Sequence, residues 1–338
     1  MTIVPKSMGR GTLVFLCLVL AAVGARLAMA WLLPPLLDVY YYDSQAAQAL
    51  LHGLDPYGHL YTGVPVWLAT PGASNVFAYL PAVPLFLLPF GLWDVRLGLI
   101  AADLVVALSI LALGGRHART ASLVFLLAPF TALFSTSYPN NTLVAMAFLG
   151  LFAALEARGK GAVGALLLGI SLAASQFLWL LYPLFVAMYL RKGRMLEVAI
   201  SLIAAAAVIS PFLVWDYNSF LHDAILFQFA RIPQSLLTPM PFGFNVNPTL
   251  DGLSATITGT GLPILVRLPS AIAALVFAAL RSRDIASTMS NSFWFILLAI
   301  WVLPSDFSWW YLELPFQILL MWFILNRGRT AGSQATNA

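Results

Sequence analysis

The stretch DVYYYDSQAAQALLHGLDPY, residues 38–57, gathers three aspartates, four tyrosines and a histidine. Side chains of these types exchange protons with a substrate or hydrogen-bond to one. The chain around them is overwhelmingly apolar, because 61% of its residues are hydrophobic and only 9% are charged. The elements that carry this stretch decide whether it is a reaction site or only the polar edge of an apolar protein.

The composition indicates a membrane protein that crosses the bilayer several times. Soluble domains carry about a quarter charged residues, whereas this 338-residue chain has several apolar runs that approach the length needed to cross a bilayer. Its single cysteine, Cys17, excludes an internal disulfide and a thiolate metal site. The net charge of +4 does not indicate a nucleic-acid partner, because the placement of Lys and Arg matters more here than their sum.

Basic residues lie in clusters between the apolar runs, and the positive-inside rule assigns such clusters to the cytoplasm. The clusters are Lys6 and Arg10, Arg116 and Arg119, Arg158 and Lys160, Arg191, Lys192 and Arg194, Arg281 and Arg283, and Arg327 and Arg329. An even number of crossings between successive clusters satisfies the rule and leaves both termini in the cytoplasm. We expect the first apolar run to be a retained helix rather than a cleaved signal peptide, because it is long and Arg26 interrupts it.

This topology predicts an all-α polytopic fold with about ten transmembrane helices in a single domain, residues 1–328. The expected helices are 11–33, 97–113, 120–135, 141–157, 161–175, 176–190, 195–214, 263–280, 289–304 and 311–326. A first outer loop spans 34–96 and a long outer loop spans 215–262. The polar residues 329–338 are expected to form a disordered cytoplasmic tail.

Two short segments of the first outer loop are expected to lie at the outer membrane surface without crossing it. Asp43 or Ser44 can cap a helix from Gln45 to His52, and its apolar stripe favours an interfacial position. The apolar segment 79–92 would span only about 21 Å as a helix, and three prolines interrupt it. We interpret this segment as re-entrant or embedded in the outer leaflet.

Acidic residues collect on the outer side of this topology, which places any acid–base chemistry on that side. They are Asp38, Asp43, Asp55, Asp94, Asp216, Asp223, Asp251, Asp306 and Glu313. Asp38 stands out, because a carboxylate where the first helix leaves the bilayer should be paired or used. The sequence has no phosphate-binding loop, HExxH pair or His/Cys cluster with metal spacing. A divalent metal such as Mg or Mn stays open, without support from spacing.

Several motifs, in their order along the chain, resemble those of the GT-C membrane glycosyltransferases. A helix-exit aspartate, Asp38, precedes a tyrosine cluster, and then come AQALLHGLDPY (47–57), FAYLP (77–81) and LLPF (87–90). The nearest pattern is that of the polyprenyl-phosphate-mannose-dependent mannosyltransferases, glycosyltransferase family 87, and GPI mannosyltransferase I proteins share a similar loop. The resemblance is strongest over 35–155 and continues loosely to FSWWYLELP (307–315).

The resemblance implies a GT-C fold and an inverting transfer of one sugar, mannose in the nearest branch. The donor is a polyprenyl-phosphate-linked sugar, and the acceptor is a lipid, glycan or protein at the outer membrane face. The leaving phosphate is stable as an anion, so a single carboxylate that takes the acceptor's proton can suffice. Asp38 is the expected general base and Asp43 the alternative, and no cofactor is expected.

The resemblance also indicates which residues bind the donor. They come from the matching motifs and from the polar tip of the second outer hairpin, and they are Tyr42, Tyr57, Tyr79, Tyr138, Asn140 and Asn141. Related proteins usually carry Lys or His at the next outer tip, where this chain has Gln176. Glutamine hydrogen-bonds a phosphate but does not neutralise it. Arg231 or Arg267 is therefore expected to supply the charge, because arginine binds phosphate as a fork.

Several of these features also admit a purely structural interpretation. The tyrosines suit an interfacial aromatic belt, and the Pro-Asn tip suits a plain turn. Asp103, inside the helix expected at 97–113, is expected to pair with Arg26 or Arg96. For the whole chain, the alternatives are a lipid or sugar transporter and an inactive GT-C-like scaffold. A transporter predicts paired ionisable residues at the bilayer midplane and symmetric halves, and no internal repeat is visible.

Overall fold

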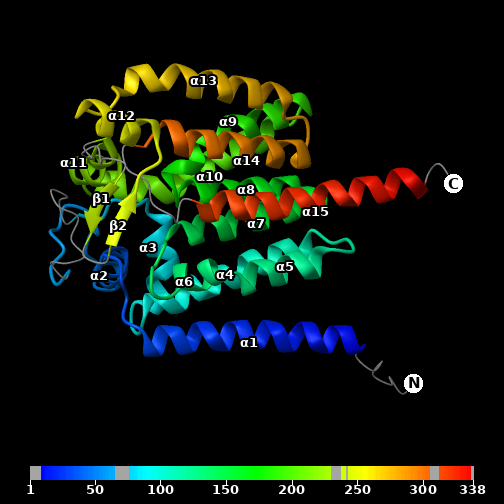
Figure 1. Cartoon of the computed structure of the whole chain (residues 1–338), viewed down its shortest axis with the longest axis horizontal. Coiled ribbons are helices and arrows are strands. Elements are labelled where there is room, and N and C mark those ends of the chain that lie inside the picture. The colour runs from blue at the N-terminus through cyan, green and yellow to red at the C-terminus, as the bar shows by residue number, and fades with distance from the viewer. Residues whose placement is uncertain (1–8, 65–75, 230–236, 241–242, 305–311, 336–338) are drawn as a thin grey trace.

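The protein is represented by a computed structural model that describes residues 9–64, 76–229, 237–240, 243–304 and 312–335. Its long helices lie side by side in one bundle (Figure 1). They are α1 (Arg10–Leu32), α4 (Val95–Ala112), α5 (Ala118–Leu127), α7 (Thr142–Ala157), α8 (Gly161–Leu172), α9 (Gln176–Arg191), α10 (Met195–Trp215), α13 (Ile264–Arg281), α14 (Ile285–Val302) and α15 (Glu313–Ala335). Helix α7 lies in the core, where it packs against α4, α8 and α15 and most of its residues are buried.

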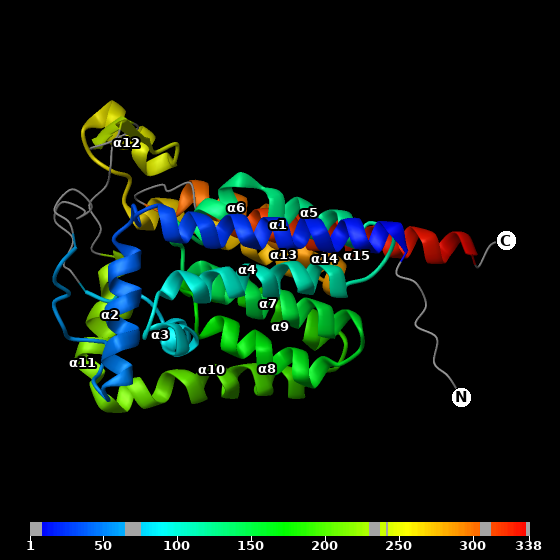
Figure 2. The ribbon, with the colours of Figure 1, turned by 90° about the horizontal axis from the view of Figure 1, so that it is seen from below.

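The two ends of the bundle differ in what they carry. Helix α1 begins and α15 ends at one end, which we call the terminal end, and the shorter elements gather at the opposite end, the loop end (Figures 1 and 2). The turns between α4 and α5, α7 and α8, α9 and α10, and α13 and α14 lie at the terminal end and carry the basic clusters. Charge is therefore segregated as the positive-inside rule requires, and the membrane side that each end faces stays a prediction.

The chain is a helical, multi-pass membrane protein. Among the described residues, five helices are long and apolar enough to span a bilayer, namely α1, α4, α10, α13 and α14, and α5, α7, α8 and α9 are apolar but shorter. The helices lie close to the ranges that the sequence predicted, whereas the number of crossings stays a prediction. Helix α15 continues to Ala335, past the point where the sequence predicted a disordered tail.

One predicted helix, 120–135, is broken into α5 and α6 (Pro129–Phe134). Pro129 has no N–H to continue the hydrogen-bond ladder and disfavours helical backbone in the residue before it. Ala128 is accordingly extended, with φ −62° and ψ 123°. The break turns the Phe125 and Ala128 carbonyls toward the Thr131 hydroxyl, whose single proton has both as acceptors, at 2.7 and 2.9 Å.

The first loop contributes helix α2 (Val39–Leu51), which runs across the ends of the long helices (Figure 2). The sequence predicted a helix from Gln45 to His52 capped by Asp43 or Ser44; the helix does form, but it begins earlier, at Val39, and the predicted caps were wrong. Asp38 is the cap, because its carboxylate accepts from the Val39 N–H at 2.9 Å. The helix ends as predicted, since Gly53 has φ +70°.

The proline-interrupted segment 79–92 forms α3 (Ala82–Leu87) and the 3₁₀ turn η1 (Leu88–Phe90). Helix α3 is seen end-on in Figure 2, across the direction of the bundle. Because α1 ends and α4 begins at the loop end, the segment between them does not cross the bundle. It packs against α2, α4 and α7.

The long loop forms α11 (Tyr217–Phe220), the π-helical turn η2 (Leu221–Ile225), the 3₁₀ turn η3 (Leu226–Phe229), strands β1 (Leu237–Met240) and β2 (Gly243–Val246), and α12 (Leu250–Thr258). The two strands pair antiparallel, with Leu237 opposite Val246. The expectation of a purely α-helical chain is therefore corrected by one short hairpin, whose four-residue strands are too short to give a periodic sequence pattern.

A buried ion pair joins α1 to α4. Arg26 Nε lies 2.9 Å from Asp103 Oδ2, and the two side chains are 1% and 0% exposed. The same guanidinium donates to the Leu126 carbonyl at 2.7 Å and to the Thr131 hydroxyl at 2.9 Å, so it also reaches the break between α5 and α6. Of the two partners predicted for Asp103, the structure selects Arg26. Arg96 instead pairs with Asp94 at 2.6 Å.

We predict that Arg26→Met alone destabilises the fold by about 3–5 kcal/mol, because it leaves Asp103 buried and uncompensated. The double variant Arg26→Met with Asp103→Leu should recover most of that loss, because it removes both charges. Unfolding of the purified variants in lipid nanodiscs measures this. A double variant that is destabilised by the sum of the two single losses would contradict the pairing.

Candidate active site

Two neighbouring asparagines at the start of α7 bind two buried carboxylates from distant parts of the chain. Asn141 Nδ2 donates to Asp43 Oδ1 on α2 at 3.0 Å, and Asn140 Nδ2 donates to Glu313 Oε2 at the start of α15, also at 3.0 Å. All four side chains are at most 5% exposed. At the loop end, the Pro-Asn tip therefore links α2 and α15 to α7 in the centre of the bundle through hydrogen bonds.

Asp43 occupies a position where helix periodicity calls for an apolar residue. The buried face of α2 consists of positions 39, 42, 43, 46 and 47, the spacing of a helix stripe. Burial raises the pKa of Asp43 to about 8, although the hydrogen bond from Asn141 opposes this shift. One of its oxygens, Oδ2, is buried and has no hydrogen-bond partner. At neutral pH this carboxyl is therefore mostly protonated.

Asp38 lies five residues earlier, at the first turn of the same helix, and is half-buried. Its charge raises the pKa of both Tyr42 and Asp43, although burial is the larger cause for each residue. The structure thus gives Asp38 a local task, capping α2, which the sequence interpretation did not foresee.

A second group of predicted residues gathers around segment 77–79, which has no regular secondary structure. The Tyr57 hydroxyl donates to the Tyr79 carbonyl at 2.8 Å, and the Tyr57 ring packs edge-on against Phe220 at 4.9 Å. Gln176 Nε2 donates to the Ala78 and Ala224 carbonyls, both at 3.0 Å. These contacts tie the first loop to α9 and to the long loop. Gln176 stands where a basic residue was expected, and its amide nitrogen joins two backbone segments.

The remaining predicted residues are spread over the loop end. Tyr42 is buried, with its ring 5.9 Å from that of Tyr61, whereas Tyr138 is 37% exposed. Arg267 is buried at the start of α13, where it donates to the Leu303 and Pro304 carbonyls at 2.9 and 3.1 Å and lies 3.7 Å from Asp251. Arg231 lies outside the described residues.

Glu313 is the residue that sequence reasoning passed over. It was noted only as one of several outer acids, yet it is fully buried and its Oε1 has no hydrogen-bond partner. The available signal for Glu313 was its position directly before an apolar run. Within the described part of the chain, no group of three or more His, Cys, Asp or Glu side chains is arranged to hold a metal ion.

Comparison with solved structures supports the fold that the sequence predicted. The chain superimposes on a crystal structure of ArnT from Cupriavidus metallidurans bound to undecaprenyl phosphate, with a TM-score of 0.59 and 16% sequence identity. The alignment covers 96% of this chain and 62% of that one, so this chain spans less than two thirds of the ArnT length. No protein-family model and no curated sequence matches. The chain therefore has an ArnT-like fold.

We predict that Asp43→Asn stabilises the protein more at pH 8 than at pH 5. Since the pKa of Asp43 rises from 3.8 to about 8 on folding, only the folded state keeps this proton between those values. Stability of the wild type therefore falls as pH rises through this window, by an amount on the order of a few kcal/mol. Asparagine has no proton to lose and still accepts from Asn141.

The thermal midpoints of the two proteins in nanodiscs, compared at pH 5 and pH 8, measure this effect. Asp94→Asn is the matched control, because it removes a partly exposed carboxylate at the same end that pairs with Arg96. An equal difference between Asp43→Asn and wild type at both pH values would show that Asp43 is ionised in the folded protein.

Proposed function

We propose that the protein is an integral-membrane glycosyltransferase that moves a sugar, mannose in the nearest resemblance, from a polyprenyl-phosphate donor to a hydroxyl acceptor. The observation that carries this is the carboxylate-bearing helix α2, fastened across the loop end of an ArnT-like bundle by Asp43 and Asn141. Helix α2 lies where the long helices end, which is the depth at which the phosphate of a membrane-embedded donor would lie.

Asp38 acts as the general base in this proposal. The acceptor oxygen bonds to the anomeric carbon of the sugar from the side opposite the phosphate, and the carbon–oxygen bond to the phosphate breaks. The electron pair leaves with the polyprenyl phosphate, the acceptor's proton goes to Asp38, and the anomeric configuration inverts. Because phosphate leaves as a stable anion, the second carboxylate that a glycosidase needs as an acid is unnecessary here.

Asp43 has a different task from Asp38. With its pKa at about 8 it holds its proton at neutral pH, and it is fully buried, so it is poorly suited to take a proton from a substrate. Its hydrogen bond with Asn141 holds α2 against α7, which positions Asp38 one turn and a half away along the same helix. We therefore keep Asp38 as the base and assign Asp43 to positioning.

Two further observations support the class of donor and the side of the membrane that the loop end faces. The ArnT structure was obtained with undecaprenyl phosphate bound, which supports a polyprenyl-phosphate carrier for this chain, with a lipid, glycan or protein as acceptor. Arg267 and Arg231 remain the candidates for the phosphate, with Gln176, Tyr138 and the hairpin tip beside them. The basic clusters at the terminal end support the proposal that the loop end faces the extracytoplasmic side and that both termini lie in the cytoplasm.

We predict that Asp38→Asn lowers kcat for sugar transfer by about 10²–10⁴-fold with little change in KM for the donor, because it removes the proton acceptor. Purified protein in nanodiscs, polyprenyl-phosphate-mannose and total membrane lipids as acceptors give the assay. Asp94→Asn, a carboxylate at the same end that pairs with Arg96, is the matched control. Full activity of Asp38→Asn would remove Asp38 as the base.

Arg267→Gln should change KM for the donor rather than kcat. If the guanidinium binds the donor phosphate, its loss raises KM for the donor by about tenfold or more, since hydrogen bonds to charged groups contribute about 1.5–3 kcal/mol. Arg281→Gln, at the other end of α13, is the control. An unchanged KM for Arg267→Gln would leave the phosphate to Arg231.

A further inference from the structure

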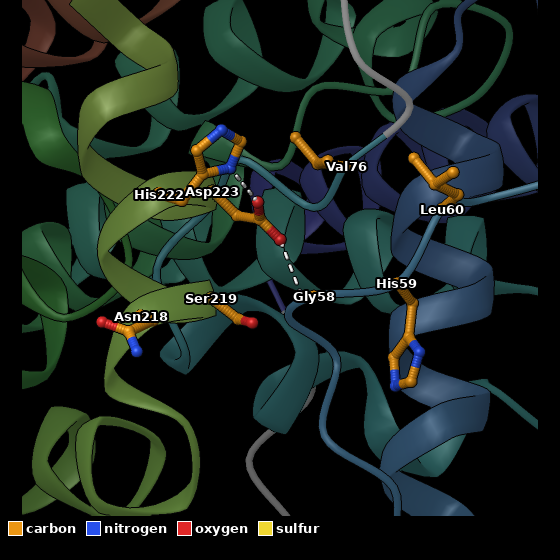
Figure 3. Close-up of a pocket in the computed structure, with 8 residues that line it drawn as sticks. All are labelled: Gly58, His59, Leu60, Val76, Asn218, Ser219, His222 and Asp223. Atoms are coloured by element: carbon orange, nitrogen blue, oxygen red, sulfur yellow. Dashed lines mark hydrogen bonds and ion pairs between the residues drawn. The ribbon is translucent and has the colours of Figure 1, made fainter.

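A pocket of about 350 Å³ opens at the loop end between the first and the long outer loops. The described residues that line it come from two segments of the first loop and from α11 and η2, and they are Gly58, His59, Leu60, Val76, Asn218, Ser219, His222 and Asp223 (Figure 3). Its size falls within the range of ligand sites, roughly 300–1,000 Å³. None of the residues on α2 or α7 described above lines it.

A histidine–aspartate pair is held in place at this pocket. Asp223 is 3% exposed, and its carboxylate accepts from the Gly58 N–H at 2.8 Å and from His222 Nδ1 at 2.7 Å. A proton on Nδ1 leaves Nε2 of the neutral ring as an acceptor. The His222 ring is 62% exposed, and its second nitrogen points away from Asp223 (Figure 3). Asp223 thus fixes the tautomer of an accessible imidazole.

The backbone around the pair is specialised in two independent ways. Gly58 has φ +76°, and a Cβ there would lie 2.5 Å from Ser219 Oγ, so only glycine lets this loop reach Asp223. His222 and Asp223 belong to a π-helical turn, η2. Turns of this kind are rare and occur frequently at functional sites.

The charge of the pocket restricts what it can hold. Asp55 lies within electrostatic range of both Asp216 and Asp223, and burial together with the charges of Asp216 and Asp223 raises the pKa of Asp55. Neither Lys nor Arg is among the described lining residues. A phosphate group would be repelled here, whereas an uncharged group rich in hydroxyls would find the Asn218 amide and His222 Nε2 as hydrogen-bonding partners.

We propose that this pocket binds the uncharged, hydroxyl-rich end of the acceptor, a sugar or similar polyol, through His222 and Asn218. The pocket adjoins the segment around Phe77, which hydrogen bonds from Tyr57 and Gln176 hold in place. The charges of both Asp43 and Asp223 raise the pKa of Tyr61, so the pocket lies close to α2. That the polyol belongs to the acceptor rests on the proposed function. Binding of a polyol in this pocket is tested without any transfer reaction.

The experiment follows modification of the four histidines by diethyl pyrocarbonate, which acylates accessible neutral imidazoles. The full-length protein is held in lipid nanodiscs, because sugar-headed detergents would compete, and methyl α-D-mannopyranoside is the probe. At about four times Kd the free fraction falls to roughly one fifth, so acylation of His222 should slow about fivefold. Exposed His52, the residue that follows α2, is the internal control and should react at an unchanged rate.

Asn218→Ala should weaken this protection by roughly two- to tenfold in Kd, the range for losing one neutral hydrogen bond. Asn291→Ala, at the terminal end of α14, is the matched control and should leave Kd unchanged. The proposal is overturned if the glycoside does not protect His222, if it protects His52 equally, or if mannose 6-phosphate protects His222 more strongly. Protection without sugar transfer would retain the pocket and reject the transferase, and transfer without protection would do the reverse.

Discussion

Two adjacent asparagines hold the loop end together by donating hydrogen bonds to two buried carboxyl groups. A carboxyl group buried without a partner costs several kcal/mol, and the hydrogen bonds from Asn141 to Asp43 and from Asn140 to Glu313 reduce this cost. Since the two amides are adjacent in sequence, the positions of α2 and α15 are coupled through one turn. The placement of Asp38, and with it the proposed chemistry, depends on that turn.

Polar groups elsewhere at this end serve the same architecture in different ways. Arg26 holds α1 to α4 and supports the proline break between α5 and α6, and Gln176 joins the first loop to the long loop. The terminal end has its own network, in which Arg194 and Lys192 contact Glu156 on α7. Basic groups thus secure one end of the bundle, whereas buried amides and carboxylates shape the other, where a substrate with hydroxyls and a phosphate would bind.

The sequence predicted the bundle because long apolar runs and basic clusters report directly on membrane helices and their order. It did not predict where α2 begins, because Asp38, Asp43 and Ser44 are all competent caps and only packing selects one. The sequence did not predict that Asp43 and Glu313 are buried, because the asparagines that contact them come from distant parts of the chain. The hairpin, the π-helical turn and the Gly58–Asp223 contact likewise depend on tertiary contacts that no local pattern encodes.

The central claim is that the loop end transfers a sugar rather than moving a lipid across the membrane. The most direct measurement follows polyprenyl-phosphate-mannose incubated with the wild-type protein in proteoliposomes that contain acceptor lipids. The account predicts release of polyprenyl phosphate and a product whose anomeric configuration is inverted relative to the donor. Movement of intact donor between leaflets without such release, or a product that retains the donor's configuration, would contradict it.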